Sequence, residues 1–268
     1  MTELINSQLQ EFLQVAIEAA QASGHVLRKY WGKISCIKEK SYAGDLVTEA
    51  DQESEQLIME ILHTRFPTHG FQGEEFGIQP IVNEDFNWVV DPLDGTTNYT
   101  HQFPFVSISI GLLYRNEPIL GVIYNPIFEE LFHGVKGNGA YLNNSKIQVS
   151  CVSNLSRSLL ATGFAYDRNE TEDNNYSEFC HLTQAAQGVR RLGSAALDLA
   201  YVAAGRLDGY WEKGLQPWDM VAGVAIVREA GGRVTAYDLS PFALNSGRVL
   251  ATNGVIHEQL SIELKKKG

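Results

Sequence analysis

The feature that most constrains this chain is an apolar run, residues 88–90, that leads directly into two acids, Asp91 and Asp94. Pro92 between them fixes the backbone as it leaves the predicted strand. Because α/β proteins place functional side chains where strands end beside loops, the two carboxylates can converge on one cation or on two adjacent cations. The Leu93 carbonyl is a further oxygen ligand for such ions.

The next residues, Gly95-Thr96-Thr97, predict the start of a helix, whose free N–H groups form an anion site beside those cations. The alternative is an ordinary β-turn, with Asp94 as a helix N-cap and Asp91 as a surface acid. Taken alone, the acid-Pro-x-acid-Gly pattern favours that structural interpretation. Other acids along the chain favour a cation-binding site over this structural interpretation.

Three further acids stand at predicted element boundaries. Glu74 follows a predicted strand, and Asp219 precedes a helix expected to begin at Met220. Asp51 is the third residue of a capping box that opens with Thr48. Each acid alone is most simply a solvated loop residue or a helix cap. An acid held at a helix N-terminus is nevertheless well oriented and stays ionised, as a metal ligand must be.

Composition narrows the class of protein. The chain has 268 residues, 44% of them hydrophobic, and a formal net charge of −11. This is a globular composition, and its charge repels nucleic acid and anionic membranes, so we expect neither as a partner. No apolar run approaches the length of a membrane span. Three cysteines without a close pair, Cys36, Cys151 and Cys180, fit a reducing compartment and predict a cytoplasmic protein.

Periodicity predicts alternating helices and strands, hence an α/β protein of layered helices and mixed sheets. Helices are expected over residues 9–20, 48–66, 176–189, 194–204 and 220–230, with a last helix ending in Lys265, Lys266 and Lys267. Strands are expected over residues 87–90, 106–114, 120–124, 131–135, 159–163, 209–211, 233–237 and 249–252. The charged stretch 38–41 with Gly44 is expected to be a loop. A change of composition near 141–150 divides the chain into halves, 1–142 and 143–268.

Four blocks of this sequence resemble the inositol monophosphatase family. They are Asp45-Leu46-Val47-Thr48-Glu49-Ala50-Asp51, Gly73-Glu74-Glu75, Asp91-Pro92-Leu93-Asp94-Gly95-Thr96-Thr97 and Trp218-Asp219-Met220-Val221-Ala222-Gly223. They occur in the family's order, and the similarity spans nearly the whole chain. One departure is Val221, where relatives usually carry a smaller residue.

The resemblance implies an αβαβα sandwich and Mg²⁺-dependent hydrolysis of a phosphomonoester, with two to three Mg²⁺ per site. The metal ligands carried over are Glu74, Asp91, the Leu93 carbonyl, Asp94 and Asp219. The catalytic residues carried over are Asp51 and Thr96, which orient the attacking water, and Glu74. The substrate contacts carried over are Asp94, Gly95, Thr96, Gly193, Ser194, Ala195, Glu212 and Asp219. Lys40 matches an outer-shell lysine.

Charge explains why such a site needs divalent ions. The five acids Asp51, Glu74, Asp91, Asp94 and Asp219 would face a phosphate ester that adds about two more negative charges. Like charges about 4 Å apart repel by about 4 kcal/mol per pair at an effective dielectric constant of 20. Mg²⁺ prefers carboxylate, water and phosphate oxygens, and the sequence has no His cluster or Cys pair of the kind that binds zinc.

Alternatives remain open. Relatives with similar motifs hydrolyse fructose 1,6-bisphosphate, histidinol phosphate or 3′-phosphoadenosine phosphate, and the Glu212 match favours a polyhydroxylated monophosphate. A regulatory relative that binds RNA polymerase or RNA is a different class, although the intact ligand set and the acidic charge argue against it. A Ca²⁺ module fails because the acids are dispersed along the chain. The resemblance also implies a homodimer and sensitivity to lithium.

Overall fold

Two N-terminal helices cover one face of a large sheet in the computed structural model, which describes residues 2–40, 42, 44–79 and 83–266. α1 (Thr2–Tyr30) buries the predicted stripe that includes Phe12, Ala16 and Ala20. α2 (Glu49–Arg65) begins at the predicted capping box, in which Ala50 N–H donates to the Thr48 hydroxyl and Thr48 N–H donates to Asp51. Both predicted helices are therefore confirmed.

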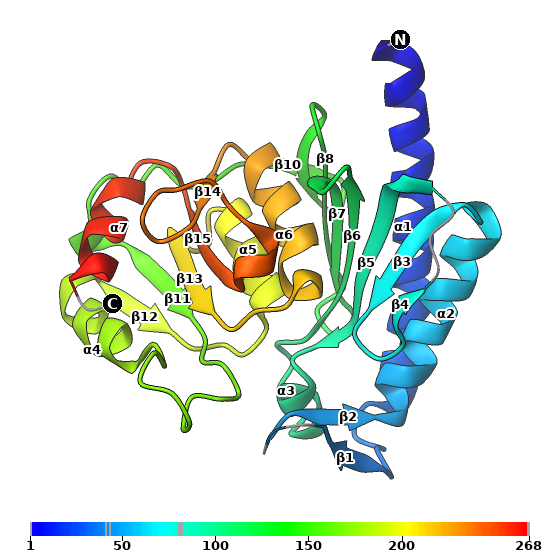
Figure 1. The fold of residues 1–268 in the computed structure, drawn as a ribbon, viewed down its shortest axis with the longest axis horizontal. Coiled ribbons are helices and arrows are strands. Elements are labelled where there is room, and N and C mark those ends of the chain that lie inside the picture. The colour runs from blue at the N-terminus through cyan, green and yellow to red at the C-terminus, as the bar shows by residue number, and fades with distance from the viewer. Residues whose placement is uncertain (1, 41, 43, 80–82, 267–268) are drawn as a thin grey trace.

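Among the described residues, the large sheet has eight strands, and it lies between the N-terminal helices and a second helical layer (Figure 1). Its spatial order is β10 (Ser145–Ile147), β9 (Gly139–Leu142), β8 (Glu130–Val135), β7 (Glu117–Asn125), β6 (Ser107–Tyr114), β5 (Asn83–Asp94), β3 (His69–Gly73) and β4 (Gly77–Gln79). All neighbours are antiparallel except β3 and β5, which are parallel. A short hairpin, β1 (Ile37–Glu39) with β2 (Leu46–Thr48), lies apart from this sheet.

A second sheet of five strands lies in the other half of the molecule. Its order is β12 (Gly188–Arg190), β11 (Leu159–Thr162), β13 (Gly209–Lys213), β15 (Arg248–Thr252) and β14 (Arg233–Thr235). Helices α5 (Ala195–Ala203) and α6 (Pro217–Glu229) lie between the two sheets, and α4 (Tyr176–Ala185) and α7 (His257–Lys265) cover the outer face of the second sheet (Figure 1). The short helix α3 (Thr96–Thr100) follows β5, and 3-10 turns occupy Leu155–Arg157 and Leu244–Ser246.

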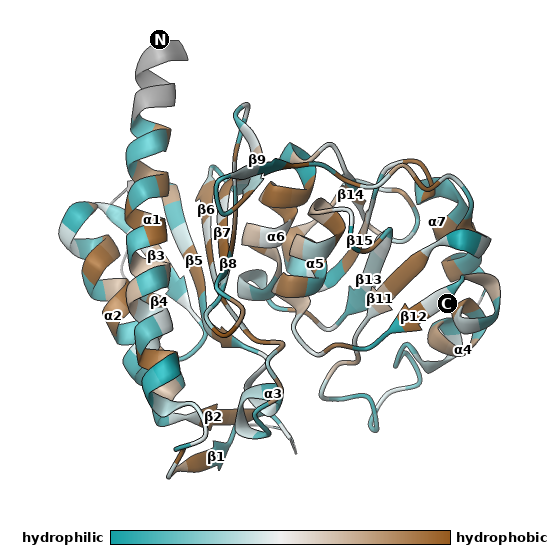
Figure 2. Cartoon of the chain, turned by 180° about the vertical axis from the view of Figure 1, so that it is seen from behind, coloured by the Kyte–Doolittle hydropathy of each residue, from teal (hydrophilic) through white to brown (hydrophobic). Residues whose placement is uncertain are grey.

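This arrangement confirms the predicted αβαβα sandwich. Apolar residues concentrate on the central strands and on α5 and α6, whereas the outer helices alternate polar and apolar faces (Figure 2). The first core lies between α1, α2 and the large sheet, and the second surrounds α5 and α6. Because α6 packs on the large sheet, the proposed halves 1–142 and 143–268 share extensive buried surface.

The strand at 106–114 differs from a half-exposed strand, because both of its faces are buried. Its small-residue face meets α6: a Cβ on Gly111 would lie 2.4 Å from Val221 Cγ1. On the neighbouring strand β7, a Cβ on Gly121 would lie 2.1 Å from the carbonyl oxygen of Ala222. Glycines therefore let the helix approach the sheet this closely. Val221 itself is fully buried there, so the larger residue is accommodated.

Two local predictions were wrong. The helix predicted to reach Val189 ends at Ala185, and Val189 instead lies in β12, where pairing with β11 satisfies its backbone. The charged stretch expected to be a loop contains β1, whose residues pair with β2. Ser41 and Lys267 lie outside the described residues.

In the part of the chain that the structure describes, we find no helix with the length and hydrophobicity that a membrane span requires.

Buried His257 predicts a loss of stability in acid. Thr235 Oγ1 donates to the Ala236 carbonyl and so accepts from His257 Nε2, while the Thr252 hydroxyl faces Nδ1 at 2.8 Å. The Thr252 hydroxyl accepts from Gly254 N–H and can donate to Nδ1, so these contacts suit a neutral imidazole, and burial lowers its pKa from 6.5 to about 4. The unfolded chain binds the proton first, so this contribution is present above pH 6.5 and is lost as the pH falls toward 4, up to about 3 kcal/mol.

The measurement is urea unfolding of the protein and of His257→Gln between pH 7 and pH 4. We expect the difference in unfolding free energy between the two proteins to shrink or change sign as the pH falls. A difference that stays constant across this range would show that His257 does not titrate in the way its contacts require.

Candidate metal and phosphate site

A β-bulge at the end of β5 brings Asp91 and Asp94 to one face of the large sheet. Asp91 pairs with Ser109 of β6 and Asp94 pairs with Ser107, with the register shift between the two acids. Side chains three residues apart on a regular strand point to opposite faces, and one extra residue cancels that alternation. Pro92 lies in the bulge, where a missing N–H is tolerated.

Asp94 is joined to the beginning of α5. Its Oδ2 accepts hydrogen bonds from the Ser194 hydroxyl at 2.6 Å and from Ala196 N–H at 2.8 Å. Ser194 is also the N-cap of α5 and accepts from Leu197 N–H. A carboxylate at this position is stabilised by the helix dipole. These hydrogen bonds hold Asp94 of β5 against the start of α5, in the second half of the chain.

Asp219 is the third residue of α6 rather than its N-cap, because the helix begins at Pro217 and not at Met220. Its Oδ2 accepts from Gln216 N–H at 2.7 Å, in a capping arrangement. The Ser109 hydroxyl of β6 donates to the Trp218 carbonyl at 3.0 Å. That contact places the first turn of α6 over the sheet face that carries Asp91 and Asp94.

Glu74 directly follows β3. The parallel pairing of β3 with β5 sets Gly73 opposite Val90, so Glu74 and Asp91 leave neighbouring strands at the same edge. Lys40 Nζ donates to Glu74 at 2.7 Å and to Glu75 at 2.5 Å. These two carboxylates hold the pKa of Lys40 above its usual range. The predicted outer-shell lysine therefore contacts the predicted ligand Glu74.

Glu55 is a buried acid beside the site that sequence reasoning missed. It is fully buried in α2, and its two carboxylate oxygens accept from Glu75 N–H and Phe76 N–H, both at 2.8 Å. A Cβ on Gly73 would lie 2.0 Å from Glu55 Oε1, so the glycine makes room for it. The available signal was an acid within the apolar stripe of a helix, one turn after Asp51 and one turn before Ile58.

For the Mg²⁺-dependent hydrolysis that the family resemblance implies, we expect Glu55→Gln to raise the Mg²⁺ concentration needed for half-maximal activity several-fold. Glutamine has one acceptor oxygen, so only one of the two N–H groups keeps its partner, and a buried N–H left unpaired costs about 1–3 kcal/mol. The measurement is a Mg²⁺ titration of phosphate release together with thermal unfolding. Gln56→Glu, on the exposed face of the same helix, is the control, and equal Mg²⁺ requirements in both variants would contradict this role.

Thr96 and Asp51 form a second hydrogen-bonded unit. Thr96 Oγ1 lies 3.2 Å from Asp51 Oδ1 and 3.1 Å from the Leu93 carbonyl. Asp51 is fully buried behind Thr96, and its other oxygen accepts from Thr48. Burial raises the pKa of Asp51 to about 7. A proton taken up by the hydroxyl of Thr96 can therefore be passed on to this carboxylate.

One cavity of about 410 Å³ gathers most of the predicted site. Its lining includes Lys40, Glu74, Asp91, Leu93, Asp94, Gly95, Thr96 and Asp219. Burial raises the pKa values of Asp91 and Asp219 well above the usual range and that of Asp94 to about 6. The negative charge of neighbouring acids adds to the effect. Lys40 is the only cationic side chain lining this cavity in the described part of the chain.

This donor set suits a hard divalent cation, because it consists of carboxylate oxygens, one backbone carbonyl and an excess of buried negative charge. Within the described residues, no three His, Cys, Asp or Glu side chains already form a compact metal cluster. Three of the acids are each held by a backbone N–H: Asp91 accepts from Leu93, Asp94 from Ala196 and Asp219 from Gln216. Glu74, Asp91, Asp94, Asp219 and the Leu93 carbonyl would hold the ions.

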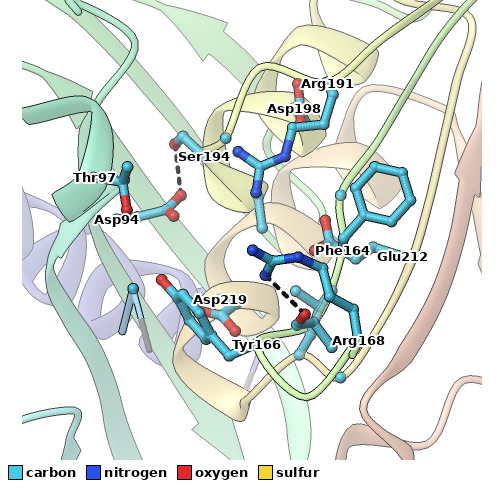
Figure 3. A pocket seen from close by; sticks show the side chains of 18 residues that line it. Asp94, Thr97, Phe164, Tyr166, Arg168, Arg191, Ser194, Asp198, Glu212 and Asp219 are labelled. Carbon is cyan, nitrogen blue, oxygen red and sulfur yellow. Dashed lines mark hydrogen bonds between the residues drawn. The ribbon is translucent and has the colours of Figure 1, made fainter. Parts of the chain in front are cut away.

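A second cavity of about 440 Å³ adjoins the first and shares Asp94, Gly95 and Asp219 with it. Gly193, Ser194, Ala195 and Glu212 also line it, so every predicted substrate contact except Thr96 lines this cavity. Thr96 lines the first cavity. Figure 3 shows Asp94, Ser194, Glu212 and Asp219 around the second cavity. Glu212 Oε2 accepts from the Tyr210 hydroxyl at 2.5 Å, and burial raises its pKa to about 7. The roles of these residues stay predictions.

Sequence reasoning missed several residues of this second cavity. Phe164, Tyr166 and Arg168 come from the segment after β11, and Arg191 and Asp198 flank the start of α5 (Figure 3). An acid within the Ala-rich run 195–203 was the one available signal, because Asp198 stands among residues that are otherwise apolar. The others belong to irregular segments, where periodicity carries no information.

Comparison with known proteins agrees with this geometry. Residues 8–267 match the model of the inositol monophosphatase family. A curated protein named inositol-1-monophosphatase, from Synechocystis sp., is 56% identical over 255 residues, which cover 95% of this chain and 89% of that protein. The Nus factor SuhB of Pseudomonas aeruginosa is 40% identical over 250 residues, covering 91% of this chain and 92% of that protein.

Among solved structures, the inositol monophosphatase from Anabaena (Nostoc) sp. superposes with a TM-score of 0.90 at 53% identity. The match covers 97% of this chain and 98% of that chain. The family match and these identities extend over both sheets and both cavities. The chain therefore belongs to the inositol monophosphatase family.

Proposed function

We propose that this chain is a Mg²⁺-dependent phosphomonoesterase that hydrolyses inositol monophosphate or a similar polyol phosphate. The observation that carries the proposal is the convergence of Glu74, Asp91, Asp94 and Asp219 beside a cavity lined by Glu212. The name of the Synechocystis relative, inositol-1-monophosphatase, supports the substrate class. Fructose 1,6-bisphosphate and histidinol phosphate are the competing substrates on the same scaffold.

Glu74, Asp91, Asp94, Asp219 and the Leu93 carbonyl would hold two to three Mg²⁺ ions, which would lower the pKa of the attacking water and neutralise charge on the leaving oxygen. Thr96 accepts a proton from that water and donates its own to Asp51. The water oxygen forms a bond to phosphorus, and the bond from phosphorus to the alcohol oxygen breaks with its electron pair going to that oxygen. The alcohol oxygen takes up a proton from a solvent water, Asp51 returns its proton to solvent, and inorganic phosphate and the free alcohol leave. The backbone N–H groups of Gly95 and Thr96 contact phosphate oxygens.

The alcohol half of the substrate lies in the second cavity. Gly193, Ser194 and Ala195 form its wall at the start of α5, and Glu212 accepts a hydrogen bond from a substrate hydroxyl. Asp94 contacts both the phosphate group and the alcohol half of the substrate, because it lines both cavities. Lys40 neutralises Glu74 and fixes its orientation.

The test is a panel of phosphate esters assayed with Mg²⁺, with a chelator, and with Mg²⁺ plus Li⁺. We expect phosphate release from inositol 1-phosphate that needs Mg²⁺ and is inhibited by Li⁺. Preference for fructose 1,6-bisphosphate or histidinol phosphate would correct the substrate, and absence of Mg²⁺-dependent release from every ester would overturn the proposal.

A regulatory function is the second candidate, because one relative carries the name Nus factor SuhB. Metal-dependent phosphate release distinguishes a phosphatase from a protein that only binds RNA polymerase. We further infer a homodimer from the family resemblance. Three exposed, unpaired cysteines support a cytoplasmic location. Light scattering coupled to size exclusion tests the dimer.

A further inference from the structure

The second cavity contains hydrogen-bonding groups that this chain leaves without partners. Asp198 of α5 is 1% exposed, and its Oδ1 has no hydrogen-bond partner among the described residues. Arg191 is exposed and lines the same cavity, and it forms no ion pair or hydrogen bond within the described part of the chain. Buried polar atoms are nearly always paired in folded proteins, so a partner from outside the chain is expected for Asp198 Oδ1, and the Arg191 guanidinium is free to bind the same ligand.

Two glycines make room for charged side chains that line the same cavity as Asp198. Gly193 has a φ of +87°, and a Cβ there would lie 2.7 Å from Arg191 Nη1, so the guanidinium lies over this glycine. A Cβ on Gly163 would lie 2.1 Å from Glu212 Oε2. Figure 3 shows the Arg191 guanidinium pointing into the cavity between Asp94 and Arg168. A side chain at either glycine would displace these groups.

The chemistry of these groups selects a ligand class. A carboxylate only accepts hydrogen bonds and a guanidinium only donates them, whereas a hydroxyl does both. Neighbouring hydroxyls on one ring can therefore donate to Asp198 and Glu212 and accept from Arg191. Arg168 and Arg191 supply donors and Asp198 and Glu212 supply acceptors to the same cavity, a pattern that matches several hydroxyls better than a second phosphate, which only accepts hydrogen bonds.

We propose that Asp198 and Arg191 are specificity-determining residues that recognise neighbouring hydroxyl groups on the alcohol half of a polyol phosphate. This inference rests on the proposed phosphomonoesterase function and extends it to residues beyond Glu212. A site that hydrogen-bonds a substrate hydroxyl discriminates strongly against an analogue that lacks it, because its polar groups are then left unpaired.

The experiment compares myo-inositol 1-phosphate with cyclohexyl phosphate, which has the same ring without hydroxyls. We expect Asp198→Asn and Arg191→Gln each to lower the ratio of kcat/KM values for the two esters about tenfold to hundredfold, mainly through the KM of the inositol ester. Arg190→Gln is the matched control, because Arg190 is exposed, adjacent and absent from the cavity lining. It should leave the ratio unchanged.

Two other outcomes overturn the inference. Equal losses on both esters would mean that the two residues act through general structure. A loss confined to fructose 1,6-bisphosphate in Arg191→Gln, with a gain in Asp198→Asn, would mean that the arginine binds a second anion. Asp198→Asn keeps the side-chain shape, and Arg191 is exposed, so both variants should fold; thermal unfolding checks this.

The same assays distinguish an error in the proposed phosphomonoesterase function from an error in the roles of Asp198 and Arg191. If the unmodified protein releases phosphate from neither ester with Mg²⁺, the proposed phosphomonoesterase function is wrong. If it hydrolyses both esters and the variants keep the original ratio, only the assignment of Asp198 and Arg191 is wrong.

Discussion

Asp94→Asn is expected to lower kcat/KM for inositol 1-phosphate at least about a thousandfold, equivalent to about 4 kcal/mol of transition-state stabilisation. Asp94 lines both cavities, so its carboxylate would bind the metal ions and would also contact the substrate. The amide keeps an acceptor oxygen for Ala196 N–H, and removing a charge relieves its repulsion with Asp219 and Glu74. The fold should therefore persist, with unchanged or increased stability in the absence of metal.

Phosphate release and the Mg²⁺-induced rise in melting temperature are the two measurements. A ligand that binds only the native state stabilises it in proportion to its affinity, so this rise should largely disappear in Asp94→Asn. The matched control is Asp208→Asn, a buried acid that accepts from Ser150 and Leu159 and lines neither cavity. Near-normal turnover in Asp94→Asn would remove the basis of the site assignment.

Thr96→Val is expected to lower kcat about a hundredfold to ten-thousandfold, the usual contribution of a positioned proton acceptor. Valine has the shape of threonine but cannot relay a proton to Asp51, which lies 3.2 Å from the hydroxyl. Because the acids remain in place, the Mg²⁺-induced rise in melting temperature should be retained. This separates Thr96 from the proposed metal ligands.

Asp51→Asn should reproduce the loss in kcat, because Thr96 then has no carboxylate to receive its proton. The combined variant should be little worse than either single variant, since the two residues act as a unit. Thr100→Val, one turn further along α3, is the control, because its hydroxyl donates to the Thr97 carbonyl. Independent, multiplicative losses in the double variant would rule out the relay.

Local chemistry along the chain predicted much of the framework. The capping box at Thr48 and Asp51 set the start of α2, because the side chain and backbone that pair are three residues apart and need no tertiary contact. Alternation of apolar and small residues likewise located β6. By contrast, the helix expected through Val189 ended early, because pairing with β11 outweighed the local helical pattern.

What the sequence determined by itself was the set of chemical groups: acids at the ends of predicted elements, with a proline and glycines that shape the turns between them. Tertiary structure alone decided which of those groups meet. The bulge between Asp91 and Asp94 depends on the register of β6, and Glu55 reaches the Glu74 loop only because α2 packs over β3. Arg191 and Asp198 enter the cavity through a turn at Gly193 that no periodic pattern encodes. Such contacts join residues far apart in the chain, and their energies depend on packing and burial that exist only after folding.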